Sequence, residues 1–453
     1  MLFEMYLSEI FNIFSQKSQN FSANSLEAPV KSINTDSRTI KPGEVFLALR
    51  GEKFDGHLFV EQAINKGAIA VICETPISVI SAKKIPQIIV QDTLNAYQII
   101  ANQWRKKVKI PIIGITGSVG KTTTKELIAA ALTTKGKVHK TQANYNNEIG
   151  VPKTLLELTS DHDYAVIEMA MRASGEIALL TQITQPTIGI ITNVGTAHIG
   201  RLGSEQAIAE AKCELLREMP QDAIAILNHD NERLIKTAAT VWQGNTLTYG
   251  LEGGDLQGEL LDQHTIKVEG MTFPLPLPGR HNALNYLAAL AVMKQLNLDW
   301  TPLTQGISVE LPQGRSQQYQ LPNDILLLDE TYNAGLESMQ AALHLLKSTP
   351  GKRYIAVLGT MKELGEKSAQ LHHKVGETAR KLDIDQLYIL VDDPEAEAIA
   401  EGAKGLVCEC LETHQALIER LIDKVEPGDR LLFKASNSVG LNRVVTALRQ
   451  ALS

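Results

Sequence analysis

The sequence predicts an α/β protein of three domains, and three observations support this. The chain has 453 residues, whereas a single hydrophobic core stops growing near ~250–300 residues. In its middle third, short apolar runs alternate with loops and with stretches of helical periodicity, which is typical of a parallel sheet covered by helices on both faces. After a break at Leu311–Gly314, a second alternation of strands and helices begins.

Residues 1–92 are predicted to form a small N-terminal α/β domain. Its clearest helix is His57–Lys66, which Gly67 ends as a C-cap glycine. The apolar segment from Leu2 to Ile13 has helical spacing, and the acidic residues within it favour an amphipathic helix over a signal peptide. The expected strands are Val45–Leu49, Ile69–Cys73 and Ile88–Val90.

Residues 93–311 are predicted to form a central domain built on a parallel sheet. A proline-rich segment, Pro274–Gly279, precedes an expected helix at Ala283–Leu296. Earlier helices are expected at Lys125–Leu132 and Ser204–Arg217. The expected strands are Ile110–Ile115, Tyr164–Ile167, Thr187–Thr192 and Ala223–Leu227.

Residues 312–453 are predicted to form a C-terminal Rossmann-like domain, a doubly wound α/β unit. No G-x-G-x-x-G motif follows its first strand, so dinucleotide binding has little support there. The expected strands are Ile325–Leu328, Tyr354–Leu358, Leu387–Val391, Gly405–Cys408 and Arg430–Phe433. The expected helices are Leu336–Leu346, Ser368–Lys381, His414–Val425 and Leu441–Leu452.

Composition and charge exclude several classes of function. The formal net charge is −7 and no block of five like charges occurs, so nucleic acid is not expected as a partner. No run of ~18 apolar residues is present, so no transmembrane span is expected. The cysteines show no disulfide framework, and Cys408 and Cys410 are interpreted as small apolar residues on a buried strand. We therefore expect a cytoplasmic protein, acting as a monomer.

The strongest chemical motif is a glycine-rich loop between an apolar strand and a helix, IPIIGITGSVGKTTT at Ile110–Thr124. Glycines let backbone N–H groups turn inward around phosphates, and a helix N-terminus favours negative charge. Lys121 would neutralise phosphate charge and Thr122 would ligate Mg²⁺. Ile115 stands where the usual G-x-x-x-x-G-K-[ST] pattern has its first glycine. The predicted phosphate-binding residues are Gly117, Ser118, Val119, Gly120, Lys121, Thr122 and Thr123.

Two further strand ends carry polar residues toward the same sheet edge. The strand Tyr164–Ile167 leads directly to Glu168, and the next strand is followed by a loop that ends at His198. Ligands of parallel α/β sheets collect at the carboxyl edge. Glu168 could also be a solvated strand-end charge, and a lone loop histidine is usually a surface residue. The convergence of both residues with the phosphate loop favours a catalytic site.

Together these residues resemble the Mur ligases, enzymes that extend the peptide of cell-wall precursors. The resemblance covers most of the chain and lies nearest to the branch that adds D-alanyl-D-alanine to UDP-N-acetylmuramoyl-tripeptide. It rests on the segments Asp36–Arg38, Gly43–Leu49, Asp55–His57, Thr141–Pro152, Asn193–His198, Ala211–Lys212, His281–Asn285, Asp329–Ala334 and Leu358–Gly365.

The resemblance implies a mechanism with ATP and Mg²⁺. ATP would phosphorylate the terminal carboxylate of UDP-MurNAc-tripeptide, and the amine of D-Ala-D-Ala would then displace phosphate from the acyl phosphate. Thr122 and Glu168 would hold one Mg²⁺ and His198 a second. Lys212 matches a position that is carbamylated in several relatives, although by itself it could be a solvated helix lysine. The implied catalytic residues are Lys121, Glu168, His198 and Lys212.

The resemblance also implies contacts in all three domains. Asn282 and Asn285, three apart on a predicted helix, would contact adenine, and capping of that helix by Asn282 is a rival interpretation. Arg315 would reach a nucleotide phosphate. The ribose-binding carboxylate falls on Glu330 or, with a one-residue shift, on Asp329. The implied UDP-sugar-binding residues are Ser37 and Arg38, and the implied substrate residues are Asn144, Asn147 and Asn333.

The chain departs from the family pattern at two places. Gly335 and Leu336 stand where the family has Asn-Pro. Ala435 and Asn437 alter a Lys-Gly-Ser-Arg segment and remove a cation from the domain expected to receive the amine. Three alternatives remain open: a sister ligase that adds a diamino acid, whose usual Asp-Asn-Pro-Arg signature is absent; a P-loop NTPase that acts as a switch; and a non-catalytic sugar-nucleotide binder.

Overall fold

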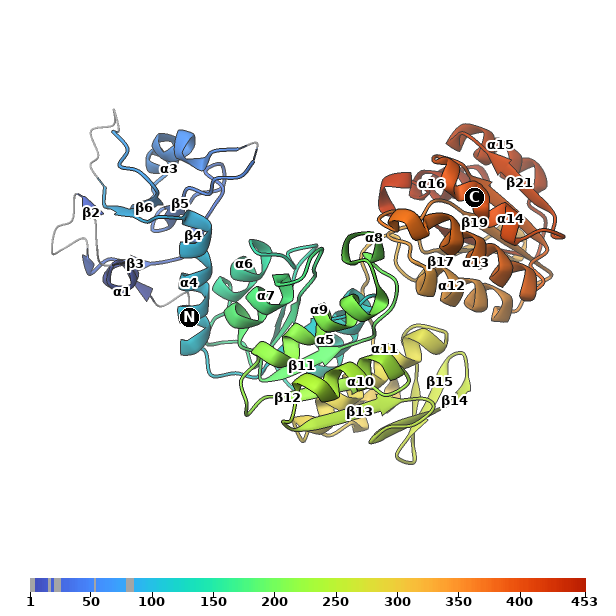
Figure 1. Ribbon diagram of the computed structural model, residues 1–453, viewed down its shortest axis with the longest axis horizontal. Coiled ribbons are helices and arrows are strands. Elements are labelled where there is room, and N and C mark those ends of the chain that lie inside the picture. Colours follow the sequence, from blue (N-terminus) through green and yellow to red (C-terminus); the bar gives the residue numbers. More distant parts are fainter. Residues whose placement is uncertain (1–4, 15–17, 20–25, 53, 79–84) are drawn as a thin grey trace.

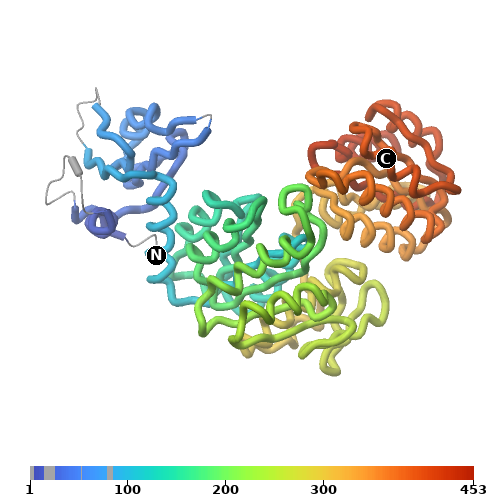
Figure 2. Tube along the Cα trace, viewed as in Figure 1, coloured from blue at the N-terminus to red at the C-terminus, as the bar shows by residue number. Residues whose placement is uncertain are grey.

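The computed structural model describes residues 5–14, 18–19, 26–52, 54–78 and 85–453. The protein is made of three α/β bodies arranged in an arc, with the N-terminal body at one end and the C-terminal body at the other (Figure 1). The chain passes through them in sequence order (Figure 2). Within the described residues, no helix combines the length and apolar composition needed to cross a membrane.

The N-terminal body is a five-stranded sheet in the order β2-β7-β6-β5-β4, with β2 antiparallel at one edge. A separate pair, β1 (Met5–Tyr6) and β3 (Pro29–Val30), is antiparallel. The sheet strands are β2 (Ser18–Gln19), β4 (Ile33–Asn34), β5 (Val45–Leu47), β6 (Ala70–Cys73) and β7 (Gln87–Ile89).

The predicted N-terminal helix is only partly correct. The helix α1 covers Leu7–Ile13, whereas Met5 and Tyr6 are extended because they pair with β3. Leu2 lies outside the described residues. The second predicted helix is present as a 3₁₀ turn, η1 (Gly56–Phe59), that continues into α3 (Val60–Asn65).

The central body is a nine-stranded sheet in the order β16-β15-β14-β13-β12-β11-β8-β10-β9. Strands β8 to β14 are mutually parallel, as predicted, whereas β15 and β16 extend the sheet as an antiparallel hairpin that the sequence analysis did not identify. The strands are β8 (Ile112–Thr116), β9 (Val138–Lys140), β10 (Tyr164–Glu168), β11 (Ile188–Ile191), β12 (Ile224–Asn228), β13 (Thr246–Gly250), β14 (Leu256–Asp262), β15 (Thr265–Val268) and β16 (Met271–Pro274).

Helices cover both faces of the central sheet, and α5 and α11 contribute residues to the site. The helix α5 packs on α11 along one face, and α4 packs on α6 and α7 along the other. The side chain of Trp104 in α4 donates to the carbonyl of Leu158 at 3.1 Å, which ties α4 to the central body. The helices are α4 (Thr93–Lys107), α5 (Lys121–Thr133), α6 (Gly150–Leu156), α7 (Glu176–Thr184), α8 (Ile199–Leu202), α9 (Glu205–Glu218), α10 (Glu232–Val241) and α11 (Arg280–Gln295).

The C-terminal body is a six-stranded sheet in the order β17-β18-β22-β19-β20-β21, parallel except for the edge strand β17. This is the predicted doubly wound unit. The strands are β17 (Gln317–Leu321), β18 (Ile325–Asp329), β19 (Arg353–Leu358), β20 (Gln386–Leu390), β21 (Cys408–Leu411) and β22 (Asp429–Lys434). The main helices are α12 (Leu336–Ser348), α13 (Ser368–Lys381), α14 (Glu397–Gly402), α15 (His414–Lys424) and α16 (Asn442–Ala451).

The interpretation of Cys408 and Cys410 as buried strand residues is wrong. The strand β21 begins at Cys408 and is the edge strand of its sheet, so Cys408 is only partly buried and Cys410 is exposed. The prediction from the apolar run was therefore wrong in two respects. The strand starts at Cys408 and not at Gly405, and it lies at the edge of the sheet. All four cysteines are free thiols.

Candidate active site

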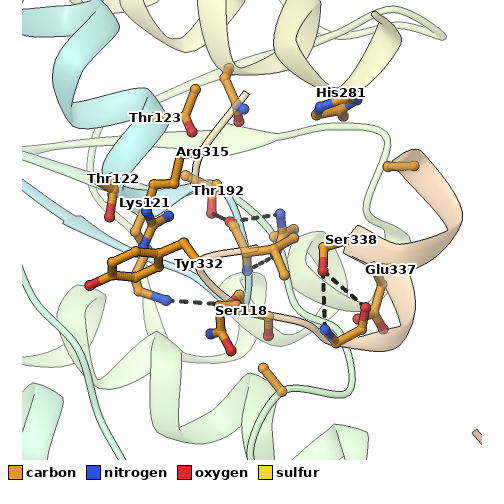
Figure 3. A pocket seen from close by; sticks show the side chains of 18 of the residues that line it. Ser118, Lys121, Thr122, Thr123, Thr192, His281, Arg315, Tyr332, Glu337 and Ser338 are labelled. Atoms are coloured by element: carbon orange, nitrogen blue, oxygen red, sulfur yellow. Dashed lines mark hydrogen bonds between the residues drawn. The ribbon is translucent and has the colours of Figure 1, made fainter. Parts of the chain in front are cut away.

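One pocket gathers residues from the central and C-terminal bodies (Figure 3). Its central side is formed by the loop after β8 and by the ends of β10 and β11, and its other side by the ends of β18 and β22. Many of the predicted site residues line it. They are Ser118, Val119, Gly120, Lys121, Thr122, Thr123, Glu168, His198, Asn282, Asn285, Arg315, Glu330 and Asn333.

The glycine-rich loop has the shape that its sequence predicts. Gly117 has a positive φ of 152° and Gly120 one of 80°. A Cβ at Gly117 would lie 1.9 Å from the hydroxyl oxygen of Thr192, so only glycine fits there. That hydroxyl donates to the carbonyl of Val119 at 2.7 Å, and the amide oxygen of Asn193 accepts from the Val119 N–H at 3.0 Å. The end of the neighbouring strand β11 therefore holds the loop in place.

The helix after this loop starts earlier than predicted. The helix α5 begins at Lys121, because Gly120 takes a left-handed backbone conformation at the N-cap position. Thr122 therefore lies in the first helical turn, where unpaired N–H groups favour anions. The Lys121 ammonium donates to the carbonyls of Gly117 and Ser118 at 2.8 and 3.2 Å, so it lies over the loop. Burial lowers the pKa of Lys121.

Glu168 is a buried carboxylate at the end of β10, not a solvated strand-end charge. Its Oε1 accepts from the side-chain amide of Asn146 at 2.8 Å, and its backbone N–H donates to the Thr141 hydroxyl at 2.9 Å. Its Oε2 has no hydrogen-bond partner and lies 4.0 Å from the ammonium of Lys125. A buried carboxylate oxygen without a hydrogen bond is costly unless a ligand or cation completes it.

The residues at this point fit a Mg²⁺ ion. Glu168 and Thr122 both line the pocket, one oxygen of Glu168 has no hydrogen-bond partner, and hard cations prefer oxygen ligands. The described residues contain no cluster of three or more histidine, cysteine or carboxylate side chains that could hold a metal. A Mg²⁺ ion here would therefore take most of its ligands from nucleotide phosphates and water, as is usual for this ion.

His198 lies at the pocket in a strained backbone conformation. Its φ is +66°, in the left-handed region, and it precedes the short helix α8. Its Nδ1 lies 2.7 Å from a carboxylate oxygen of Glu363, which comes from the C-terminal body. Burial is the main effect that lowers the pKa of His198, followed by the positive charge of Lys121.

Lys212 is buried in α9, so it is not a solvated helix lysine. No hydrogen bond or ion pair of its ammonium is found among the described residues, and it does not line the pocket. Burial, reinforced by the charge of Lys121, lowers the pKa of Lys212 well below its ordinary value. A buried lysine without a partner favours the neutral amine.

The predicted adenine pair lies on one face of α11. The Asn285 amide oxygen accepts from the Thr124 hydroxyl at 3.1 Å, which connects α11 to the phosphate-loop helix. The Asn282 amide donates to the Pro278 carbonyl at 2.9 Å, and Gly279 is the N-cap of the helix, so Asn282 does not cap it. Both asparagines line the pocket.

The C-terminal side of the pocket carries two cations, Arg315 and Lys434, and two carboxylates, Glu330 and Glu337. The guanidinium of Arg315 stacks 3.9 Å over the ring of Tyr332, and its buried Nε has no partner (Figure 3). The Lys434 ammonium is buried, which lowers its pKa, and it lies 3.9 Å from the carboxylate of Glu330. A group of positive charges around a pocket favours a polyanionic ligand.

The two candidates for the ribose contact differ in position. Glu330 lines the pocket, and its carboxylate accepts from the Ser316 hydroxyl at 3.1 Å. Asp329 is buried at the end of β18, where it accepts from the hydroxyl and the N–H of Thr331 at 2.6 and 3.1 Å. Because both bonds of Asp329 are internal, Glu330 is the carboxylate that remains available.

Several predicted residues lie outside this pocket. The hydroxyl of Ser37 donates to the Gln62 side chain at 2.7 Å in the N-terminal body. The neighbouring Arg38 is exposed. Asn144 is exposed, and Asn147 accepts from the Gly150 N–H at 2.9 Å at the start of α6.

The structure adds pocket residues that the sequence analysis did not select. Asn146, which lies between the predicted Asn144 and Asn147, is the asparagine that reaches Glu168. Asn228 and Asn231 donate to carbonyls of the loop after β11, at Thr192 and Val194. Their places directly after an apolar strand were the available signal. The others include Asn193, His281, Tyr332, Glu337, Ser338 and Lys434.

Comparisons with known families agree with this arrangement. Family models described as Mur ligase family catalytic domain, Mur ligase middle domain, and Mur ligase glutamate ligase domain match residues 29–105, 115–293 and 314–437. A UDP-N-acetylmuramoyl-tripeptide–D-alanyl-D-alanine ligase of Synechocystis is 58% identical over 419 residues, which are 92% of this chain and 92% of that protein. The chain belongs to the Mur ligase family.

Solved structures resemble this Mur ligase over nearly its whole length. A structure of MurF from Acinetobacter baumannii has a TM-score of 0.89 at 30% identity and covers 99% of both chains. The MurF ligase from Thermotoga maritima, solved in complex with ADP, has a TM-score of 0.83 at 32% identity and covers 93% of this chain and 97% of that one. The three-domain α/β architecture is therefore that of a Mur ligase.

Proposed function

We propose that this Mur ligase adds D-alanyl-D-alanine to UDP-N-acetylmuramoyl-tripeptide and consumes ATP. The products are the UDP-MurNAc-pentapeptide precursor of peptidoglycan, ADP and phosphate. The observation that carries the proposal is the 58% identity to a ligase of that name across 92% of the chain. A pocket with a phosphate loop on one side and the Rossmann-like sheet on the other supports it.

The chemistry follows from the need to activate a carboxylate. A carboxylate oxygen of the tripeptide attacks the γ-phosphorus of ATP, and the bond from that phosphorus to the bridging oxygen of ADP breaks. The amine of D-Ala-D-Ala then attacks the acyl carbon and loses a proton. The bond from that carbon to the bridging oxygen breaks, and the oxygen leaves with its electron pair as part of the phosphate. Preorganised cations lower the barrier because the anions crowd together in both steps.

Each of the following pocket residues has its own role in this reaction. Lys121 neutralises charge on the β- and γ-phosphates from its place over the loop. Thr122 and Glu168 would hold one Mg²⁺ and His198 would help to hold a second, and the metal would supply charge neutralisation. The remaining nucleotide contacts are Asn282 and Asn285 to adenine, Arg315 to a phosphate, and Glu330 to ribose.

Lys212 takes part as its carbamate. Burial lowers the pKa of Lys212 well below its ordinary value and so favours the neutral amine, the form that adds carbon dioxide. A carbamate would replace the positive charge of Lys212 with oxygen atoms of the kind that Mg²⁺ prefers. The UDP-sugar is held by Ser37 and Arg38, and the peptide by Asn144, Asn147 and Asn333.

The three bodies correspond to three roles. Residues 1–92 bind the UDP-sugar, residues 93–311 bind ATP, and residues 312–453 receive the amine. The protein acts as a monomer in the cytoplasm, where its free thiols stay reduced. Residues from two bodies line the pocket, so closure of the domains completes the site.

A single assay tests the proposal. ADP release is measured with UDP-MurNAc-tripeptide, and separately with UDP-MurNAc-dipeptide, while D-Ala-D-Ala, meso-diaminopimelate or L-lysine is offered in turn. Turnover is expected with D-Ala-D-Ala alone. Turnover only with a diamino acid and UDP-MurNAc-dipeptide would assign the chain to a sister ligase, and nucleotide hydrolysis without ligation would assign it to the switch NTPases.

A further inference from the structure

The loop that carries His198 belongs to the central body, which holds its first residues, whereas Thr196 and His198 also bond to the C-terminal body. The carboxylate of Glu337, in the first turn of α12, accepts from the N–H and the hydroxyl of Thr196 at 2.8 and 3.1 Å. The backbone carbonyl of Glu363 accepts from the Gly200 N–H at 3.1 Å. The short helix α8 and the turn η4 (Gly365–Lys367) lie in direct contact.

The side chain of Glu363 makes the two polar contacts at the centre of this junction. One carboxylate oxygen lies 2.7 Å from Nδ1 of His198, and the other accepts from the guanidinium of Arg201 at 3.0 Å. His198 and Glu363 each have a φ of +66°, in the left-handed region. Non-glycine residues rarely adopt that region, and such strain persists only where surrounding contacts enforce it.

The contact to Glu363 determines which nitrogen of His198 is free. A carboxylate only accepts hydrogen bonds, so Nδ1 must carry the hydrogen. In the neutral ring this leaves the lone pair on Nε2 for a metal. Carboxylates that hold a ligating imidazole in this way fix its tautomer and its orientation, and their loss typically lowers metal affinity ~10–100-fold.

We propose that Glu363 is a positioning residue that presents Nε2 of His198 to the second metal. This inference rests on the proposed function, because it assumes that His198 binds a metal beside the nucleotide. It adds that metal binding depends on the position of the C-terminal body, since the orienting carboxylate comes from there. A domain movement that receives the amine is thereby coupled to the metal site that serves the phosphoryl group.

Arg201 provides a matched control. Its guanidinium contacts the other oxygen of the same carboxylate, across the same junction. Its bond to His198 runs from the backbone N–H to the His198 carbonyl at 3.0 Å, which an alanine at this position keeps. An Arg201→Ala variant removes one ion pair from the interface and leaves the imidazole–carboxylate bond in place. The comparison therefore separates orientation of His198 from general loosening of the junction.

The experiment measures binding of Mn²⁺, as a paramagnetic substitute for Mg²⁺, to the full chain with ADP. Free Mn²⁺ is counted by electron paramagnetic resonance for the wild type and for the variants Glu363→Ala, Glu363→Gln, His198→Ala and Arg201→Ala. We expect Glu363→Ala and His198→Ala each to weaken Mn²⁺ binding at one site at least ~tenfold. A variant that combines both changes should lose no more Mn²⁺ affinity than either single variant. Glu363→Gln, whose amide oxygen can still accept from Nδ1, should lose less, and Arg201→Ala should stay within twofold of the wild type.

Two sets of results would overturn the inference, and they differ. If His198→Ala weakens the site but Glu363→Ala does not, or if Arg201→Ala loses as much as Glu363→Ala, then Glu363 does not position the ligand. If His198→Ala binds Mn²⁺ as the wild type does, the metal role of His198 in the proposed function is wrong. Thermal melts of each variant show whether it remains folded during the titration.

Discussion

The molecule contains two candidate phosphate-binding sites, and they are built in opposite ways. In the central body Lys121 is partly buried, and its ammonium donates to the backbone carbonyls of Gly117 and Ser118. In the N-terminal body the side chain of Arg38 is 80% exposed, and its guanidinium forms two parallel bonds to Asp36 at 2.9 and 2.8 Å.

The two sites differ in the contacts that each cation loses when it binds a phosphate. Lys121 exchanges neutral carbonyl contacts for charged ones inside a pocket, where each charge interaction is strong because water is excluded. Arg38 must leave an ion pair in water to bind a diphosphate, so its net gain is small. The central site is therefore expected to control the chemical step, and the N-terminal site to control substrate affinity.

The largest expected effect is that of Lys121→Ala. Loss of this charge should reduce ADP release by at least ~10²–10³-fold, because the charge acts on the transferred phosphoryl group. Binding of UDP-MurNAc-tripeptide, measured by calorimetry, should change by less than twofold. Lys137→Ala, an exposed lysine of the same body, is the control and should keep full activity. Equal loss of turnover and UDP-sugar binding would contradict the assignment of ATP to the central body and of the UDP-sugar to the N-terminal body.

The next effect is that of Glu168→Gln. The glutamine can still accept from Asn146, but the negative charge that faces the metal is lost. The Mg²⁺ concentration that gives half-maximal ADP release should rise at least ~tenfold, with partial rescue at high Mg²⁺. A variant with unchanged Mg²⁺ dependence would show that the free oxygen of Glu168 does not face a metal.

A smaller, selective effect is expected from Arg38→Ala. Because Arg38 exchanges one exposed ion pair for another, its net contribution is small, so the KM for UDP-MurNAc-tripeptide should rise no more than about fivefold. The kcat and the KM for ATP should remain within twofold. A fall in kcat with an unchanged KM would place Arg38 in the chemical step and would remove the contrast between the two sites.

The smallest effect concerns Asp36. Its bonds to Arg38 lower the pKa of Asp36 to about 2 from the ordinary 3.8. Because the folded pKa lies below the unfolded one, the stabilisation is complete well above 3.8 and is lost as the pH falls from 3.8 toward 2. The group is exposed, so Asp36→Asn should lower Tm at neutral pH by only about 1–2 °C. This difference should shrink in melts at acidic pH, and a difference that grows would contradict the assignment.

Much of the fold follows from the sequence because its strands are continuous apolar runs. The runs before Thr116 and Glu168 predicted β8 and β10, and the residues after them were correctly placed at one edge. The hairpin β15–β16 was missed because its short strands alternate with polar residues and lack such runs. The exposure of Cys410 depends on strand order, which periodicity does not encode.

The site was predictable in its motifs but not in its contacts. The loop and Glu168 follow strands directly, so local sequence indicates both. The choice among Asn144, Asn146 and Asn147 depends on how one loop turns, and only Asn146 reaches the carboxylate. The partner of His198 is Glu363, 165 residues away in another body, and no local pattern connects them.

The most direct test of the central claim follows the oxygen atoms of the reaction. The terminal carboxylate of UDP-MurNAc-tripeptide is labelled with ¹⁸O and turned over with ATP and D-Ala-D-Ala, and the released phosphate is analysed by mass spectrometry. If the pocket activates the carboxylate as an acyl phosphate, each phosphate should carry one ¹⁸O atom from the substrate. Phosphate that contains no label, released together with ligated product, would contradict the account.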